Sequence, residues 1–203
     1  MTQLTLPKWF DFHAHMRQGA LLAPMIEAHH AMGCFGFLAM PNTKPPVAKV
    51  SEHESLDCWS IEGYRQQLLD AGGDRFDDII VPLYLTRDTT PAMIEAGAKS
   101  GLLRAAKYYP PHGTTGADFG YPFAEFLTND VFKALADNGV TLCIHGEQHG
   151  LEAEDYFDRN TNAEEQFYAE QMPRLIDQLP HLRVVGEHIT TEVAAHFIAS
   201  APE

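Results

Sequence analysis

The stretch WFDFHAH, residues 9–15, joins an apolar run to two histidines at its end. Similar apolar runs recur five times along the chain, at residues 35–40, 79–85, 103–109, 140–145 and 183–189. Mostly continuous apolar runs are typical of strands that are buried on both faces of a sheet. Together with the run at residues 9–13, the sequence therefore predicts six such strands.

Helical patterns lie between these runs. They cover residues 19–33 with a start near Pro24, a segment from the capping box of Ser51 and Glu54 to Gly72, a segment from Thr90 and Pro91 to Gly101, a segment from Thr128 to Gly139, residues 163–179 with a kink or restart at Pro173, and a last helix from Thr190 or Thr191. Alternating strands and helices indicate an α/β fold with a parallel sheet. We therefore expect one α/β domain over residues 1–203, without the glycine-rich phosphate loop of a dinucleotide-binding fold.

The composition narrows the class of protein. The 203 residues include 14 Lys and Arg against 28 Asp and Glu, so the formal net charge is −14. This balance argues against nucleic-acid binding and against docking on anionic membranes. No run approaches the roughly 18 apolar residues of a spanning helix, and the N-terminus has no signal-peptide pattern. Three cysteines without CxxC spacing fit a reducing compartment, so we expect a cytoplasmic protein.

His13 and His15 stand at the end of the first predicted strand. Residues i and i+2 of a strand point to one face, so the two imidazoles form half of a transition-metal site. They could also be two polar caps of a strand end, because an isolated HxH arises easily by chance. Arg17 follows two residues later and could hold an anionic group of a substrate or lie at the surface.

Three further polar residues end predicted strands: Lys107, His145 and His188. Lys107 could extend its ammonium group to solvent, or its amine could add carbon dioxide to form a carbamate that bridges two metal ions. A lone histidine at a strand end is more often structural than a ligand. In a parallel α/β barrel, however, the strand ends converge at one mouth, which brings these three residues to His13 and His15. Nitrogen donors with a bridging anion suit paired zinc ions better than magnesium or calcium.

An ordered set of motifs resembles the dihydroorotases of the amidohydrolase superfamily, in their homodimeric bacterial and yeast-like group. The matching stretches are DFHAHMRQG (11–19), MPNTKPPV (40–47), AAKYYP (105–110), HGTTG (112–116), IHGE (144–147) and GEHITT (186–191). The resemblance covers essentially the whole chain. It implies a TIM-barrel-like (β/α)8 metal-dependent hydrolase fold, of which this chain holds about six βα units, so we expect an incomplete barrel at the C-terminal side.

The resemblance also implies roles for individual residues. His13 and His15 would bind one zinc ion, His145 and His188 a second, and carbamylated Lys107 would bridge the two. Arg17 and Asn42 would hold the carboxylate of the substrate, and Thr114 and Thr115 would lie on a loop that closes over it. The implied reaction is the reversible cyclisation of N-carbamoyl-L-aspartate to dihydroorotate in pyrimidine biosynthesis, carried out by a homodimer.

Two departures from the family pattern matter. Gln18 stands where the family usually has an aspartate, and the aspartate that the family's eighth strand supplies as a catalytic group has no counterpart in this chain. Three interpretations therefore stay open beside the dihydroorotase: another cyclic-amide hydrolase, a catalytically impaired structural or regulatory subunit, and a piece of a longer product.

Overall fold

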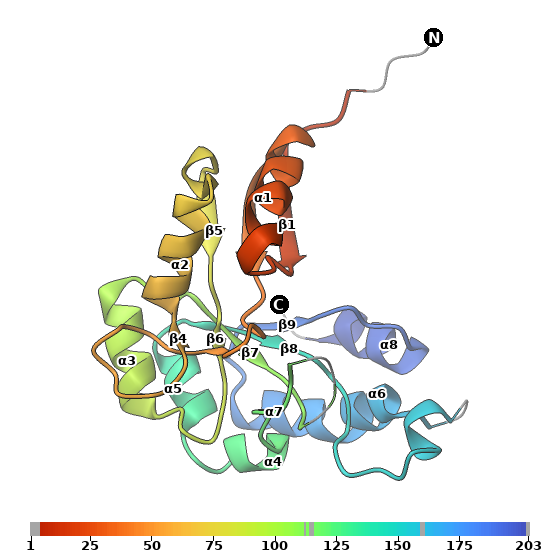
Figure 1. Cartoon of the computed structure of the whole chain (residues 1–203). Coiled ribbons are helices and arrows are strands. Elements are labelled where there is room, and N and C mark those ends of the chain that lie inside the picture. The colour runs from red at the N-terminus through yellow and green to blue at the C-terminus, as the bar shows by residue number, and fades with distance from the viewer. Residues whose placement is uncertain (1–4, 112, 114–115, 159–160, 202–203) are drawn as a thin grey trace.

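The computed structural model describes residues 5–111, 113, 116–158 and 161–201. Its strands are β1 (Trp9–Ala14), β2 (Cys34–Ala39), β3 (Val47–Lys49), β4 (Trp59–Ser60), β5 (Asp78–Ile80), β6 (Leu83–Tyr84), β7 (Ala105–Tyr108), β8 (Thr141–Ile144) and β9 (Val184–Gly186). Its α-helices are α1 (Leu22–Ala31), α2 (Ile61–Asp70), α3 (Pro91–Ser100), α4 (Phe123–Phe126), α5 (Val131–Asp137), α6 (Ala163–Gln166), α7 (Met172–Gln178) and α8 (Glu192–Ser200). Strands and helices alternate along most of the chain (Figure 1), which confirms the predicted α/β class.

The strands form parallel sheets. One sheet has the order β1-β2-β5 and another the order β6-β7-β8-β9, while β3 and β4 form a small parallel pair that the apolar runs did not predict. The chain passes from the first sheet to the second between β5 and β6. Because parallel strands run in one direction, the carboxyl ends of the strands in each sheet lie on the same side.

The run at residues 79–85 is not the single strand that we expected. It is divided into β5 and β6, and Pro82 lies between them. Proline has no backbone N–H to donate to a sheet, so it interrupts the pairing. Ile79 therefore pairs with β2, whereas Leu83 pairs with β7 in the other sheet.

Three helix starts agree with the sequence. The hydroxyls of Thr90 and Thr191 each accept a hydrogen bond from the backbone N–H three residues later, at 3.2 and 3.3 Å, and so cap α3 and α8. Pro173 lies in the first turn of α7, directly after a π-helical segment (Phe167–Gln171), so the hydrogen-bonding pattern of the long helical stretch changes where a kink or restart was predicted.

The predicted capping box of Ser51 and Glu54 is wrong. The helix α2 begins only at Ile61, where the hydroxyl of Ser60 accepts a hydrogen bond from the backbone and caps it. The carboxylate of Glu54 instead accepts hydrogen bonds from the backbone N–H groups of Val50 and Ser51, at 2.8 and 2.9 Å. These bonds stabilise a turn, which is the alternative use of the same residue types.

The predicted cap at Thr128 is also wrong. Its hydroxyl donates a hydrogen bond to the carbonyl of Glu125 at 3.0 Å. The helix α5 begins at Val131, whose N–H donates to the side-chain oxygen of Asn129 at 3.2 Å. The start therefore lies two residues later than the sequence pattern predicted.

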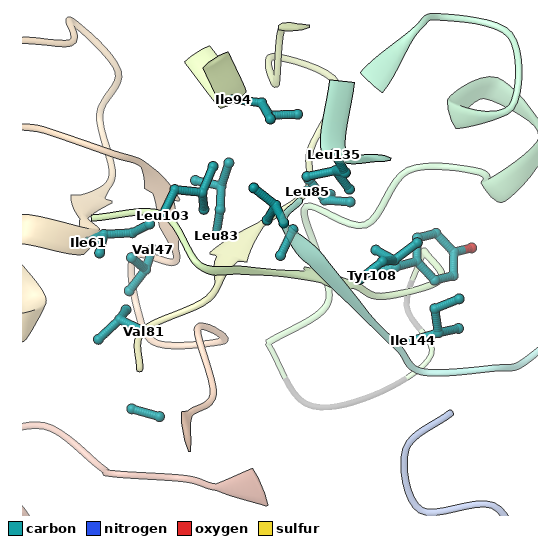
Figure 2. Packing of buried hydrophobic residues seen from close by; sticks show 14 of the residues in the cluster. Val47, Ile61, Val81, Leu83, Leu85, Ile94, Leu103, Tyr108, Leu135 and Ile144 are labelled. Carbon is teal, nitrogen blue, oxygen red and sulfur yellow. The ribbon is translucent and has the colours of Figure 1, made fainter. Parts of the chain in front are cut away.

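Apolar side chains from strands and helices form the core. Figure 2 shows Leu85 beside Leu135 of α5, and Ile144 beside Tyr108 of β7, and all four side chains are fully buried. Burying a side chain of this size stabilises a fold by about 1.5–3 kcal/mol. Among the helices that the structure describes, none has the length and apolar character needed to cross a membrane.

In the described part of the chain, β1 is one of the two outer strands of the sheet β1-β2-β5, and β9 is one of the two outer strands of the sheet β6-β7-β8-β9. Each carries an exposed apolar side chain: Phe12 on β1 is 68% exposed and Val185 on β9 is 43% exposed. An outer strand with apolar side chains has unpaired backbone groups on one side and can accept a further strand.

Candidate metal centre

The carboxyl ends of β1, β7, β8 and β9 position the predicted ligands. His13 lies in β1 and Lys107 in β7, while His145 follows β8 and His188 follows β9. The sheet pairing continues beyond two strand ends, since the N–H of His145 donates to Tyr108 and the N–H of Glu187 donates to Ile144, both at 3.1 Å. These bonds hold the residues after β8 and β9 beside their neighbouring strands.

Asp11 holds the backbone of β1 just before the two histidines. One of its carboxylate oxygens accepts a hydrogen bond from the N–H of His13 at 2.9 Å, and the other lies 3.1 Å from Nε2 of His29 on α1. The register between β1 and β2 is irregular after Asp11. Asp11 therefore ties this irregular strand end to the helix that follows it.

The structure brings the five predicted metal ligands into one cluster. The Nε2 atoms of His13 and His15 lie 3.3 Å apart, and the rings of His13 and His188 have centroids 5.2 Å apart. The ring of His145 lies 4.5 Å from that of His188, again between centroids. Lys107 joins the cluster through the carboxylate of Glu187, to which its ammonium group donates a hydrogen bond.

The predicted ligand set did not include Glu187. Its carboxylate is buried, contacts Lys107, and lies 2.9 Å from Nδ1 of His13. The signal in the sequence was its place at the end of an apolar strand, directly before His188. One donor atom from each of His13, Glu187 and His188 lies within 4.8 Å of the other two, so these residues form a group that could hold a metal ion.

Lys107 is completely buried, which excludes the interpretation that its side chain extends to solvent. Burial lowers the pKa of Lys107, and the attraction of Glu187 opposes this shift only in part. For Glu187, burial by itself would raise the pKa, but the contacts with His13 and Lys107 outweigh it and hold the pKa below its usual value. The two side chains therefore stabilise each other inside the cluster.

The imidazoles of His15 and His188 are predominantly neutral at neutral pH. Burial, followed by repulsion from His145 and Lys107, lowers the pKa of His188 to about 4. Burial, followed by repulsion from His13 and Arg17, also lowers the pKa of His15. A neutral imidazole is the form that binds metal ions.

The geometry also fits a metal. Nδ1 of His15 is buried and has no hydrogen-bond partner among the residues that the structure describes. The backbone of His188 has a φ of 39°, in the left-handed region that is strained for such a residue. Facing imidazole nitrogens, an orphaned buried nitrogen and a strained histidine are features of a site in which a transition metal replaces the missing partners.

Two of the predicted substrate residues lie beside this cluster. Arg17 is exposed and Asn42 is buried, and both line a cavity of about 240 Å³ together with His15. Asn42 acts against the effect of burial and raises the pKa of His15. Gln18 lines the same cavity, and its side-chain amide donates to Gln67 at 3.2 Å. The other two predicted substrate residues, Thr114 and Thr115, lie outside the described residues.

The chain is similar to known dihydroorotases in sequence and in fold. No protein-family model matches the chain. A dihydroorotase of Pseudomonas putida (strain W619) is 39% identical over 202 residues, which cover 98% of this chain and 53% of the relative. The crystal structure of dihydroorotase from Saccharomyces cerevisiae in complex with 5-fluoroorotic acid superposes with a TM-score of 0.78 and 26% identity, over 93% of this chain and 50% of that one.

A more distant structure supports the fold alone. L-hydantoinase from Arthrobacter aurescens has a TM-score of 0.61 at 15% identity, over 96% of this chain and 44% of that chain. The parallel α/β arrangement thus matches about half of the TIM-barrel folds of dihydroorotase and hydantoinase. The chain is therefore a homologue of the dihydroorotases, and it spans about half the length of the curated relatives that it matches.

Proposed function

We propose that the chain carries the metal centre of a zinc-dependent dihydroorotase, which interconverts N-carbamoyl-L-aspartate and dihydroorotate in pyrimidine biosynthesis. The observation that supports this most is the cluster of four strand-end histidines around a fully buried lysine, in a chain that is 39% identical to a dihydroorotase. His13 and His15 would hold one zinc ion, His145 and His188 another, and carbamylated Lys107 would bridge them. Zinc supplies a polarised carbonyl and a water of lowered pKa in such centres.

The residues of the cavity would bind the substrate. Arg17 presents a guanidinium group and Asn42 an amide, the two donor types that recognise a carboxylate. Because the net charge of the chain is −14, its overall field repels an anionic substrate. Binding then depends on local donors such as Arg17. Thr114 and Thr115 are proposed as further residues that bind the substrate.

Assembly and location follow from the same proposal. The chain would act in a homodimer in the cytoplasm, and its three cysteines, Cys34, Cys58 and Cys143, are all free thiols, as a reducing compartment allows. A different cyclic-amide hydrolase would use the same metal ligands but another substrate contact, so substrate profiling separates the two.

The test is turnover of dihydroorotate and of hydantoin by the purified chain with zinc and bicarbonate supplied. We expect turnover of dihydroorotate that falls to background in Lys107→Ala and returns in part when small carboxylic acids replace the carbamate. Lys133→Ala, which removes an exposed lysine on α5, is the matched control and leaves turnover unchanged. A chain that binds zinc but turns over neither substrate contradicts the enzyme proposal.

The exposed outer strands favour a second candidate, a structural or regulatory subunit without turnover of its own. Phe12 and Val185 leave apolar surface at β1 and β9, where a second polypeptide can pair with the sheets. A catalytically silent chain that forms a stable complex with a longer dihydroorotase would support this candidate.

A further inference from the structure

We infer that, while Lys107 carries no carbamate, the chain binds one divalent transition-metal ion between His13, Glu187 and His188. The inference rests on the proposed function in so far as both need a metal in this cluster. It differs in assigning a ligand role to Glu187 and in making the first ion independent of the carbamate.

The three donor atoms already lie close enough. They are within 4.8 Å of one another. A tetrahedral zinc ion with bonds of about 2.0–2.1 Å needs neighbouring donors roughly 3.3 Å apart. The distance of 2.9 Å between Nδ1 of His13 and Oε2 of Glu187 lies below this value, so these two atoms would have to move apart slightly to hold the ion.

The donor set has the composition of a catalytic zinc site. Two imidazoles and one carboxylate leave a fourth position for water or substrate. The three residues differ in burial: Glu187 is buried, His13 is half-buried and His188 is exposed. His188 is therefore the member of the group that is most accessible to solvent.

Lys107 supports this site from behind. Its ammonium group donates to the carboxylate of Glu187, and ligand carboxylates are commonly oriented by such a hydrogen bond. The ring of Tyr109 lies 5.0 Å from the same ammonium group, which adds a cation–π contact. In this state Lys107 positions a ligand but is not itself a ligand.

Carbamylation changes this arrangement. The ammonium group of Lys107 first loses one proton. The neutral amine then forms an N–C bond to carbon dioxide and releases a second proton, so a cation beside Glu187 is replaced by an anion. Two adjacent buried anions repel each other unless a cation lies between them. An ion already held by Glu187 supplies that charge. The first ion should therefore bind without bicarbonate, and the second only with it.

The experiment is a zinc titration of the chelator-treated chain in buffer freed of carbon dioxide, with calorimetry as the readout. A parallel titration with cobalt(II) is monitored by the visible spectrum. We expect one ion per chain. Glu187→Gln should bind it at least about 100-fold more weakly, since even changes to residues behind a ligand cost 10- to 100-fold. Glu147→Gln is the matched control, because its carboxylate lies 3.3 Å from His145, outside the group of three.

Lys107→Met separates the two metal proposals. It retains Glu187 but cannot be carbamylated, so it should still bind one ion, at most about 100-fold more weakly, and no second ion when bicarbonate is added. Far-UV circular dichroism confirms that each variant is folded. If Lys107→Met binds no ion, or if Glu187→Gln binds as tightly as the unmodified chain, the inference is wrong.

The two proposals can fail separately. One ion without bicarbonate, with neither a second ion nor a carbamate signal in the carbon-13 spectrum after labelled bicarbonate is added, supports the inference and contradicts the paired zinc centre. Two ions that bind only with bicarbonate support the paired centre and overturn the inference.

Discussion

Lys107 on β7 donates a hydrogen bond to the carboxylate of Glu187, which lies 80 residues further along the chain and directly after β9. Both side chains are buried, and the same carboxylate oxygen lies 2.9 Å from Nδ1 of His13. The contact connects the ends of three strands. Without a metal ion, the buried positive charge of Lys107 is compensated by the negative charge of Glu187. This affects the stability of the chain as well as metal binding.

Breaking this pair should destabilise the metal-free chain. Removal of one partner of a buried ion pair typically costs about 3–5 kcal/mol, because the other charge stays buried without compensation. We expect Glu187→Ala to lower the free energy of unfolding by that amount in urea titrations. The double variant Glu187→Leu with Lys107→Met should recover most of the loss. A single variant as stable as the unmodified chain would show that the pair does not stabilise the fold.

Metal removal should lower the thermal stability. A ligand at 100 times its dissociation constant stabilises the folded state by about 2.7 kcal/mol if it does not bind the unfolded chain. For a chain of this size, that corresponds to a shift of about 5–10 °C in Tm. We expect scanning calorimetry to show this shift between chelator-treated and zinc-loaded protein. His188→Ala should abolish it, whereas His196→Ala, on the exposed face of α8, should leave it intact.

Arg17 should control substrate affinity more than the rate of the chemical step. Loss of a hydrogen bond to a charged group costs about 1.5–3 kcal/mol, which corresponds to an increase of about 10- to 100-fold in KM. We expect Arg17→Ala to show this increase for dihydroorotate with a smaller change in kcat. Arg75→Ala removes a guanidinium that pairs with Glu27 on the surface and serves as the control. An unchanged KM would remove Arg17 from the substrate site.

Glu164 should stabilise the start of α8 in a pH-dependent manner. Its carboxylate accepts hydrogen bonds from the N–H and hydroxyl groups of Thr190 and Thr191, at 2.7–3.2 Å. Although burial raises the pKa of Glu164, these bonds outweigh it and hold the pKa below the ordinary value of 4.5. A lowered pKa contributes stability above pH 4.5, and this contribution disappears as the pH falls through the folded-state pKa.

Glu164→Gln tests this contribution. We expect the variant to lose about 1–3 kcal/mol of unfolding free energy at pH 7, with the difference shrinking as the solution becomes more acidic than pH 4.5. Glu170→Gln, at an exposed position of the neighbouring segment, should change little at any pH. A difference for Glu164→Gln that does not depend on pH would contradict the role of the ionised carboxylate.

The outer strands should promote association. Val185→Lys places a charge on the edge of β9 and should reduce self-association or complex formation in analytical ultracentrifugation. Phe157→Lys is a matched control, because Phe157 is 89% exposed but lies outside the strands. Equal effects of the two changes would show that general surface hydrophobicity, and not the strand edge, drives association.

Local sequence predicted most elements and the strand-end residues that the structure brings into one cluster. Continuous apolar runs marked the strands that carry Lys107 and precede His145, since a strand buried on both faces needs apolar residues at successive positions. Threonine at position 90, followed by Pro91, marked a helix start correctly. The capping box predicted at Glu54 was wrong, because a carboxylate near backbone N–H groups can stabilise either a helix cap or a turn. Packing elsewhere in the fold decides between the two.

The sequence by itself determined the α/β class, the strand-end positions of His13, Lys107 and His188, and the likeness to dihydroorotases. Only the tertiary structure divided the run at 79–85 between two sheets, and only it revealed Glu187 as the partner of Lys107. The physical reason is the distance along the sequence between the residues that interact. Periodicity and capping are set by neighbours within a few residues, whereas the pairing of two buried charges 80 residues apart depends on how the strands assemble.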